Sequence, residues 1–439
     1  MEKTITGIVQ CNEQLLNFYG ENYKFTFMST DGKTHFIKAI DGFIFGYTHE
    51  KHRIAIYAGN AQIPVVGKGD LNTGSYIVST SNTYEQELGV YKAIIFSGGT
   101  INSLAMPYGY EQEHLEDGNI LLRHNDDSKE YTFKMNEQVC KVSIFSSSNT
   151  HLGIDGLKIK NDTMNFMIEF PEEQPLKKIY EHIAQIKELL AFMTFRRNVG
   201  FDEIKILQYD ERFEDNLMAV AKVYIKEKED FTKKTIWENI GFGDLGKSMG
   251  NMLELIFNSE DNKPSFVLGF IPQNDRDINI MTNMKLREIC SALECELSFI
   301  NDIKSEENKN LQLLIGELKK IIKEHRKSSD ALTQKTYDFI FSSMSHWSLS
   351  ASDKIIELYH RYEQQMQLLN PKPMNLTDGM IEEFVKYRNK ITHGSYRILN
   401  YNVAITAHVL SGLVYCCLLK RIGVSDASIL EWCSTKILK

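Results

Sequence analysis

The stretch NSEDNKP, residues 258 to 264, decides the fold of this 439-residue chain, because the sequence changes character on either side of it. It holds no large apolar residue, and polar clusters of this kind connect domains. Of the 27 glycines, 21 precede residue 251 and 6 follow it. Since glycine marks turns between strands and is disfavoured inside helices, this distribution predicts turn-rich β structure before the stretch and helices after it.

Residues 1–257 predict a β-rich N-terminal domain. Short runs rich in β-branched and aromatic residues alternate with clusters of Asp, Asn, Gly and Ser. The runs are YKFTFMS (23–29), THFIKAI (34–40), HRIAIYAG (52–59), SYIVST (75–80), YKAIIFSGG (91–99), EYTFKM (130–135) and KVSIFSS (141–147). A helix is expected near 175–195, and EIKILQY and MAVAKVYI then predict returning strands. We expect a sandwich or a barrel-like domain with a regulatory or sensing role.

Residues 265–439 predict an all-helical domain. Apolar residues of the segment 311–322 recur at i, i+3, i+4 and i+7, namely at Leu311, Leu314, Ile315, Leu318, Ile321 and Ile322. Three further segments, 353–369, 379–393 and 403–419, follow the same period. Four or five helices joined by short polar loops form a bundle. The predicted fold class is therefore α+β, a β-rich domain followed by an all-α helical bundle.

Composition limits the classes of function. A net charge of -8 argues against a protein that coats nucleic acid through bulk positive charge, so any nucleic-acid site must be local. The seven cysteines are scattered and show no metal-ligand spacing, which indicates a reduced, cytoplasmic environment. No group of His, Asp and Glu has a recognisable metal spacing either, and we expect no cofactor. The apolar segment 403–419 is shorter than a membrane span and contains His408 and Ser411, so we interpret it as a buried helix.

The segment GFGDLGKS, residues 241–248, matches the P-loop pattern GxxxxGK[ST]. A P-loop requires a buried strand that leads into its first glycine. The preceding TIWENI instead places Glu238 and Asn239 at positions that such a strand fills with apolar residues. We interpret the segment as a glycine-rich turn after which Lys247 and Ser248 begin a helix.

The segment FVKYRNKITHG, residues 384–394, places an arginine on an apolar helix face. Thr377 or Asp378 can cap this helix, and Ile381, Phe384 and Val385 define its buried side. Seven residues after Ile381, Arg388 falls on the same side. An uncompensated buried charge costs several kcal/mol, so Arg388 needs either a carboxylate of this chain or an anion that binds later. The sequence leaves both partners open.

His393 supplies a second functional group. In a straight helix it lies about 140° around the axis from Arg388, but Gly394 suits the left-handed position that ends a helix and lets the last turn redirect the imidazole. Histidine moves protons near neutral pH, and arginine binds phosphate through two charged hydrogen bonds. These groups suffice to cleave RNA without a metal: a base activates the ribose 2′-OH, and a cation stabilises the negative charge on the phosphate.

The residues around the pair fit the same chemistry. Asn389 can hydrogen-bond the phosphate or hold the histidine. Lys386, Lys390 and Arg397 make the neighbourhood positive and are candidate RNA-binding residues, although a solvated helix surface explains them equally well.

RNKITH matches the R-N-x-x-x-H pattern of HEPN-domain ribonucleases and lies late in the helical half, where that family carries it. With the β-rich half in front, the layout resembles ApeA-type proteins of bacterial anti-phage defence. The resemblance implies an endoribonuclease that acts by abortive infection, with Arg388 and His393 catalytic and Asn389 supporting them. It also implies an RNA substrate such as tRNA, a homodimer or higher homo-oligomer that brings two motifs together, a phage-derived trigger and no membrane. The alternative is a catalytically silent HEPN module that binds nucleotide, RNA or a protein.

Overall fold

A computed structural model gives the structure of the chain. It describes residues 4–11, 14–80, 88–105, 110–114, 120–124, 128–153, 156–210, 213–226, 236–259, 266–300, 306–328, 331–345, 350–369, 375–392 and 398–438.

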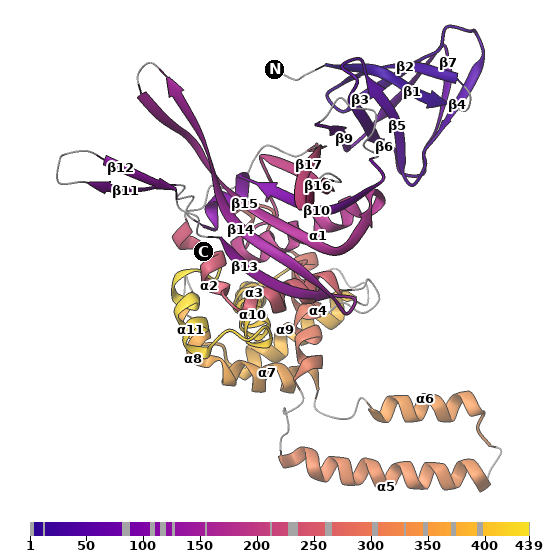
Figure 1. Ribbon diagram of the computed structural model, residues 1–439. Helices are drawn as coiled ribbons and strands as arrows, with labels where there is room; N and C mark the ends of the chain where they lie inside the picture. The colour runs from indigo at the N-terminus through magenta and orange to yellow at the C-terminus, as the bar shows by residue number, and fades with distance from the viewer. Residues whose placement is uncertain are drawn as a thin grey trace. The chain divides into compact units, whose positions relative to one another are not determined.

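The fold is α+β, with β structure first and helices after it, which confirms the predicted fold class (Figure 1). The chain divides into two compact units. The first comprises Met1–Asn258 with Gln273–Asp275, and the second comprises Ser259–Pro272 with Arg276–Lys439. The predicted domains were 1–257 and 265–439. Their predicted roles in regulation and RNA cleavage stay predictions.

The first unit is built on one antiparallel sheet with the strand order β13-β14-β15-β10-β16-β17-β9-β6-β5-β1-β2-β3-β8-β7-β4. Its strands are β1 Ile5–Cys11, β2 Gln14–Glu21, β3 Lys24–Met28, β4 Thr34–Lys38, β5 Phe43–Thr48, β6 Arg53–Tyr57, β7 Gln62–Val66, β8 Lys68–Asn72, β9 Ser75–Ser79, β10 Val90–Ser97, β13 Lys129–Met135, β14 Gln138–Gly153, β15 Gly156–Pro175, β16 Glu203–Asp210 and β17 Phe213–Ile225. A separate ribbon pairs β11, Tyr110–His114, with β12, Ile120–His124.

Two-residue turns set the register of the hairpins in this sheet. Asn22 and Tyr23 join β2 to β3, and both have positive φ, at 51° and 61°. Asn136 and Glu137 join β13 to β14 in the same way, at 49° and 66°. Two consecutive positive φ angles match the right-handed twist of the flanking strands. Because the turn fixes the register, β2 alternates buried and exposed residues from Leu16 onward.

The strands β1 to β9, which stand together at the β4 end of the strand order, enclose an apolar core of their own. Inward-facing side chains from successive strands make it up, among them Val9, Leu16, Phe18, Phe25, Phe27, Ile37, Ile54, Ile56 and Val65. Aromatic rings contribute edge contacts, such as Phe25 against Tyr76 with ring centroids 5.5 Å apart. This core stabilises these strands against one another.

The other part of the sheet, which contains β13, β14, β15, β10, β16 and β17, packs against helices. α1 spans Ile179–Thr194, within the range expected from the sequence, and α3 spans Ser248–Phe257. Phe257 of α3 contacts Phe133 of β13, with ring centroids 4.9 Å apart. His182 of α1 is stacked on Phe170 of β15 at 4.6 Å. Aromatic contacts therefore fix both helices against this part of the sheet.

The segment that resembles a P-loop adopts another conformation. A short 3-10 helix, Ile236–Glu238, precedes Gly241, so no strand leads into the first glycine of the pattern. Gly241 donates its backbone N–H to Asp244 Oδ2 at 2.7 Å. α2, Phe242–Leu245, follows, and α3 begins at Ser248. The backbone N–H of Gly241 is thus already hydrogen-bonded to a carboxylate of the same segment.

The second unit contains helices only, among the residues that are described. They are α4 Asn283–Phe299, α5 Glu306–Ser328, α6 Gln334–Ser345, α7 Ala351–Arg361, α8 Glu363–Leu368, α9 Asp378–Thr392, α10 Tyr401–Arg421 and α11 Asp426–Thr435. The segment 353–369, expected as one helix, forms two, because the chain leaves helical geometry at Tyr362. α10 is long and apolar enough to cross a membrane, and 78% of its apolar window is buried inside the protein.

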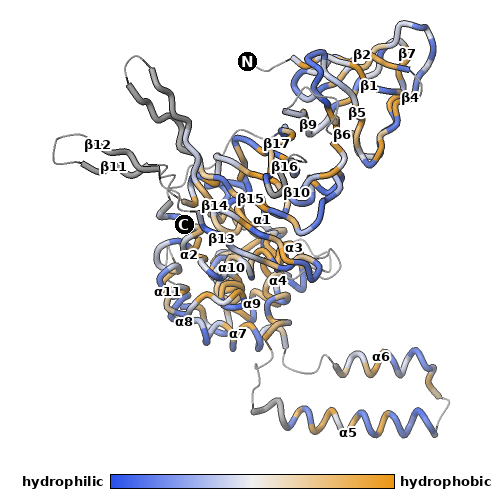
Figure 2. Tube along the Cα trace, in the orientation of Figure 1, coloured by the Kyte–Doolittle hydropathy of each residue, from blue (hydrophilic) through white to orange (hydrophobic). Residues whose placement is uncertain are grey.

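α5 and α6 form a pair of their own. His325 Nδ1 lies 2.7 Å from the Tyr337 hydroxyl, which links α5 to α6. Figure 2 shows apolar positions alternating with hydrophilic ones along α5. Of its predicted apolar stripe, Ile315 is buried, whereas Leu314 and Ile321 are exposed. The stripe does not form bundle core as expected, since an apolar period marks a face but not the element that covers it.

Candidate functional site at the end of helix α9

The helix that carries the R-N-x-x-x-H motif begins as the sequence predicts. Met380 donates its backbone N–H to Thr377 Oγ1 at 3.3 Å, so Thr377 caps α9. Ile381, Phe384, Tyr387 and Ile391 form its buried face. α9 packs against α4, α7 and α10 through this face. The motif therefore starts on a helix that is anchored on one side and open on the other.

Arg388 lies at the edge of this face rather than within it, with its side chain 27% exposed. The expected face, drawn through Val385 and Arg388, is rotated from the observed one, which is centred on Phe384, Tyr387 and Ile391. The observed face includes Tyr387, whose side chain carries a hydroxyl group. In the structure that hydroxyl donates to Asn283 Oδ1 at 3.0 Å, which lets the ring be buried.

Among the described residues, the guanidinium of Arg388 has two polar contacts. Nη2 donates to Glu294 Oε1 at 2.7 Å, and Nη1 donates to Asn389 Oδ1 at 3.1 Å. Of the two partners that the sequence left open, the carboxylate of this chain is therefore present. Glu294 is 46% exposed, and an ion pair at the surface contributes only about 0–1 kcal/mol. A phosphate, which carries more acceptor oxygens, can replace it at small cost.

Glu294 belongs to α4, 94 residues before Arg388 in the sequence. No local pattern connects the two positions, so sequence reasoning missed this residue. One turn earlier on α4, burial raises the pKa of the Cys290 thiol to about 12, with Arg388 lowering it and Glu294 raising it by smaller amounts. Cys290 therefore stays protonated near neutral pH and is no nucleophile.

Arg287, also on α4, contacts the end of α9. Its Nη2 donates to the backbone carbonyl of Ile391. The last carbonyls of a helix lack partners within the helix and carry partial negative charge, so a cation stabilises them. This contact holds α9 in place two residues before His393. Arg287 was not among the predicted site residues, because only the packing of α4 on α9 brings it here.

The predicted RNA-binding lysines differ from one another. Lys386 is paired with Glu382 Oε2 at 2.9 Å, one helical turn away. Lys390 is exposed in the last turn of α9, as is Asn389. Three positive side chains thus lie at the last turns of α9. Arg388 and Lys390 belong to α9 itself, and Arg287 reaches it from α4.

His393, Gly394 and Arg397 lie outside the described residues. α9 extends through Thr392, the residue directly before His393. Of the predicted site residues, the structure brings Arg388 and Asn389 together.

The remaining histidines of the helical half differ in their surroundings. His360 Nε2 lies 3.0 Å from Asp378 Oδ1 at the surface, and His346 lies outside the described residues. His408 of α10 is half-buried, and among the described residues its Nε2 has no hydrogen-bond partner. In the part of the chain that is described, no group of His, Cys, Asp and Glu could hold a metal ion.

Comparison with protein families, with curated proteins and with solved structures finds no match to this chain.

Proposed function

We propose that the second unit is a metal-independent endoribonuclease of HEPN type, with Arg388, Asn389 and His393 in its active site. The observation that carries the proposal is the geometry of the motif: Arg388 and Asn389 are hydrogen-bonded to each other in the last turns of α9, five and four residues before His393 in the sequence. Lys390 and Arg287 add positive charge to the same helix end. A phosphate diester with a neighbouring 2′-OH is the substrate that suits these groups.

The reaction needs no cofactor. His393 accepts the proton of the ribose 2′-OH, and the oxygen attacks the adjacent phosphorus. Arg388 stabilises the negative charge on the phosphate oxygens as the bond to the 5′ oxygen breaks. The leaving 5′ oxygen takes up a proton, and the products carry 2′,3′-cyclic phosphate and 5′-hydroxyl ends. Asn389 orients Arg388 or hydrogen-bonds the phosphate.

Substitution of the motif tests this proposal. Purified full-length chain is incubated with end-labelled RNA, including tRNA, in EDTA. Arg388→Ala and His393→Ala each remove a group used in the transition state, so cleavage falls by about 10²–10⁴-fold. Arg361→Ala, which removes another helix-surface arginine paired with a glutamate, is the matched control and keeps full activity. Equal cleavage by all three variants would contradict the assignment.

The second candidate is a catalytically silent module that binds nucleotide, RNA or protein. The ion pair between Arg388 and Glu294 favours it, because the arginine already has a carboxylate partner. This module would bind RNA in a filter assay and leave it intact, with or without EDTA. The nuclease would instead cut RNA in EDTA.

We further propose that the protein acts in the cytoplasm in anti-phage defence by abortive infection, as a homodimer whose β-rich unit responds to a phage-derived trigger. The support for this setting is the resemblance of the motif and layout to ApeA-type proteins. Overexpression should slow growth of the host cell, and His393→Ala should remove the effect. Slow growth that persists in the variant would favour a binding mechanism over cleavage.

A further inference from the structure

Three lysines of α5 form a positive surface outside the motif of α9. Lys319, Lys323 and Lys327 follow one another at intervals of four residues, and we call them the lysine row. On a helix this spacing places successive side chains about 40° apart around the axis, and the row covers about 12 Å of its length. Glu317 and Glu324 lie about 60–80° beyond Lys327, so they do not interrupt the row.

The lysine row begins beside the face of α5 that packs on α6 and turns away from it. Ile315, one turn before Lys319, is buried, and the hydroxyl of the buried Tyr337 of α6 lies 2.7 Å from His325 Nδ1 of α5. Each later lysine lies about 40° farther from the side of Ile315. Lys319 is accordingly half-buried, whereas Lys323 and Lys327 are exposed. The row therefore runs along a flank of α5 that α6 leaves open.

The lysine row lacks the carboxylates that accompany cations on other helices of this chain. Lys386 is paired with Glu382 on α9, and Arg361 is paired with Glu357 on α7, each at a spacing of four residues. In the row the neighbour at this spacing is another lysine, and among the described residues no carboxylate lies within ion-pair distance of the three. Because like charges four residues apart destabilise a helix, an anion that binds the row relieves their repulsion.

The helix dipole accounts for only one end of the row. Cations stabilise the partial negative charge at the end of a helix, and this effect falls off within the last turn. α5 ends at Ser328, so Lys327 lies in that turn. Lys323 and Lys319 lie five and nine residues before the end of the helix. A bound polyanion explains these two positions better than the dipole does.

The row suits a partner with several negative charges along one chain. An ammonium group is a compact point charge that contacts phosphate oxygens and reads no base. Each phosphate that a lysine neutralises releases counterions, so three lysines act together on a nucleic-acid backbone. Because the whole chain has a net charge of -8, a local surface of this kind is needed to hold RNA.

We infer that the lysine row binds the phosphate backbone of the RNA that the motif cleaves, independently of its base sequence. The inference rests on the proposed ribonuclease function and adds a second contact for the same substrate. An anionic membrane also attracts lysines, but a helix at a membrane surface inserts its apolar face between the lipids. The apolar face next to the row, at Ile315, is buried instead.

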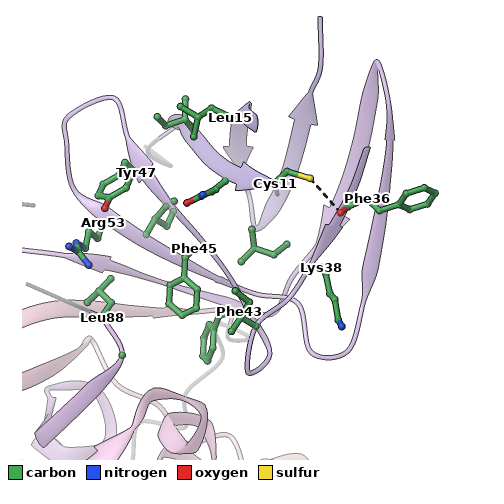
Figure 3. A pocket seen from close by; sticks show the side chains of 16 residues that line it. Cys11, Leu15, Phe36, Lys38, Phe43, Phe45, Tyr47, Arg53 and Leu88 are labelled. Atoms are coloured by element: carbon green, nitrogen blue, oxygen red, sulfur yellow. Dashed lines mark hydrogen bonds between the residues drawn. The ribbon is translucent and has the colours of Figure 1, made fainter. Parts of the chain in front are cut away.

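A groove at β4 in the first unit does not offer the same chemistry. Figure 3 shows this groove, which has a cavity volume of about 700 Å³ and is lined by residues of β1, β4 and β5 among others. Most of its lining is apolar, including Leu15, Phe43 and Phe45. Removing a charged phosphate from water against apolar walls is unfavourable. Lys38 also lines the groove, and this lysine therefore serves as a control below.

Fluorescence anisotropy with two labelled RNAs, a tRNA and a single-stranded oligonucleotide of unrelated sequence, tests the inference. Each full-length chain also carries Arg388→Ala, so that the RNA stays intact. Combined Lys319→Gln, Lys323→Gln and Lys327→Gln should weaken binding of both RNAs at least 10-fold at low salt. The slope of log K against log salt concentration should become shallower by about 2–3. Unchanged affinity and slope would overturn the inference.

The matched control removes the same charge from the first unit. Combined Lys33→Gln, Lys38→Gln and Lys68→Gln changes three exposed lysines, one of them at the groove, and should leave the affinity for RNA unchanged. Equal weakening by both triple variants would show that only total charge matters and would also overturn the inference. Glutamine has nearly the helix propensity of lysine, so α5 should stay helical, and circular dichroism checks this.

Single-turnover cleavage by chains with an intact motif separates this inference from the ribonuclease proposal. The row variant should need at least 10-fold more RNA to reach half of its maximal rate, but should reach the wild-type rate at saturation. Cleavage that depends on Arg388 and not on the row would remove this inference alone. RNA binding that depends on the row without cleavage would remove the ribonuclease alone. Row-dependent flotation with phosphatidylserine vesicles, without RNA binding, would assign the row to a membrane surface.

Discussion

Arg388 is half-buried and donates to two different acceptors, an amide oxygen and a carboxylate. The strength of these contacts determines whether its guanidinium can also bind a phosphate. Asn389 is its neighbour in the motif, whereas Glu294 comes from another helix and is nearly half exposed. Because the ion pair with Glu294 contributes about 1 kcal/mol or less, it can hold the guanidinium in place and still be exchanged for a phosphate.

Glu294→Gln tests this exchange. The amide keeps a hydrogen-bond acceptor but loses the charge that competes with phosphate, so RNA should bind several-fold more tightly while the free energy of unfolding changes by less than about 1 kcal/mol. KM for labelled RNA and urea unfolding measure the two effects. Glu357→Gln, which removes the partner of Arg361 on α7, is the control. Loss of cleavage in Glu294→Gln would instead make Glu294 a positioning residue.

His182 provides a pH-dependent contribution to stability in the first unit. Burial, with a smaller effect of Lys178, lowers its pKa to about 4 from 6.5. Between these values the unfolded chain binds the proton and the folded chain does not, so the stabilisation is full above pH 6.5 and is lost as the pH falls toward 4. From pH 7.5 to 5 we expect a loss of about 2 kcal/mol.

Urea unfolding of wild type and His182→Gln at both pH values measures this loss. In His182→Gln, the free energy of unfolding should lack the pH dependence that His182 contributes. His49→Gln, an exposed histidine of the same unit, should keep it. An unchanged pH slope in His182→Gln would show that other groups govern acid sensitivity.

At the scale of the element, α9 depends on α4 for its position. α4 supplies Asn283 to the Tyr387 hydroxyl, Glu294 to Arg388, and Arg287 to the carbonyl of Ile391. These contacts follow the helix from its middle to its last turn. The end of α9 that carries the motif is thus held in place by α4, which contains no residue of the motif.

Arg287→Ala should loosen the end of α9 without removing any group of the motif. In the proposed ribonuclease, kcat should fall by about 10-fold, because small displacements of reacting groups cost rate, and Arg287→Lys should recover part of it. Single-turnover cleavage of labelled RNA checks this. Amide exchange at Ile391 and Thr392 should be faster in Arg287→Ala, and unchanged exchange would contradict the positioning role.

At the scale of the whole molecule, the proposed dimer makes a prediction about mixed chains. Light scattering should give a mass of twice the 50.6 kDa of one chain. If Arg388 of one chain acts with His393 of the other, a mixed dimer of Arg388→Ala and His393→Ala contains one intact site. Co-expression should then restore up to half the activity, whereas each variant alone is inactive. No recovery from a purified mixed dimer would place both groups in one chain.

The local patterns of the sequence determined the elements. Glycine-rich turns, β-type runs and helical periods predicted the α+β class, the strands around residues 23–147 and the helix that carries Arg388, because each depends on neighbours within about one or two turns of chain. The same logic separated the GFGDLGKS turn from a P-loop.

Only the tertiary structure decided which surfaces meet. The partner of Arg388 is Glu294, 94 residues away, and the apolar stripe of α5 leaves Leu314 exposed. The groove at β4 lies where β1 and β5 separate, and no local sequence pattern predicts that separation. The period of a sequence shows that a helix face is apolar or that a charged residue falls on it. The packing of distant elements determines what covers that face and which residue pairs with that charge.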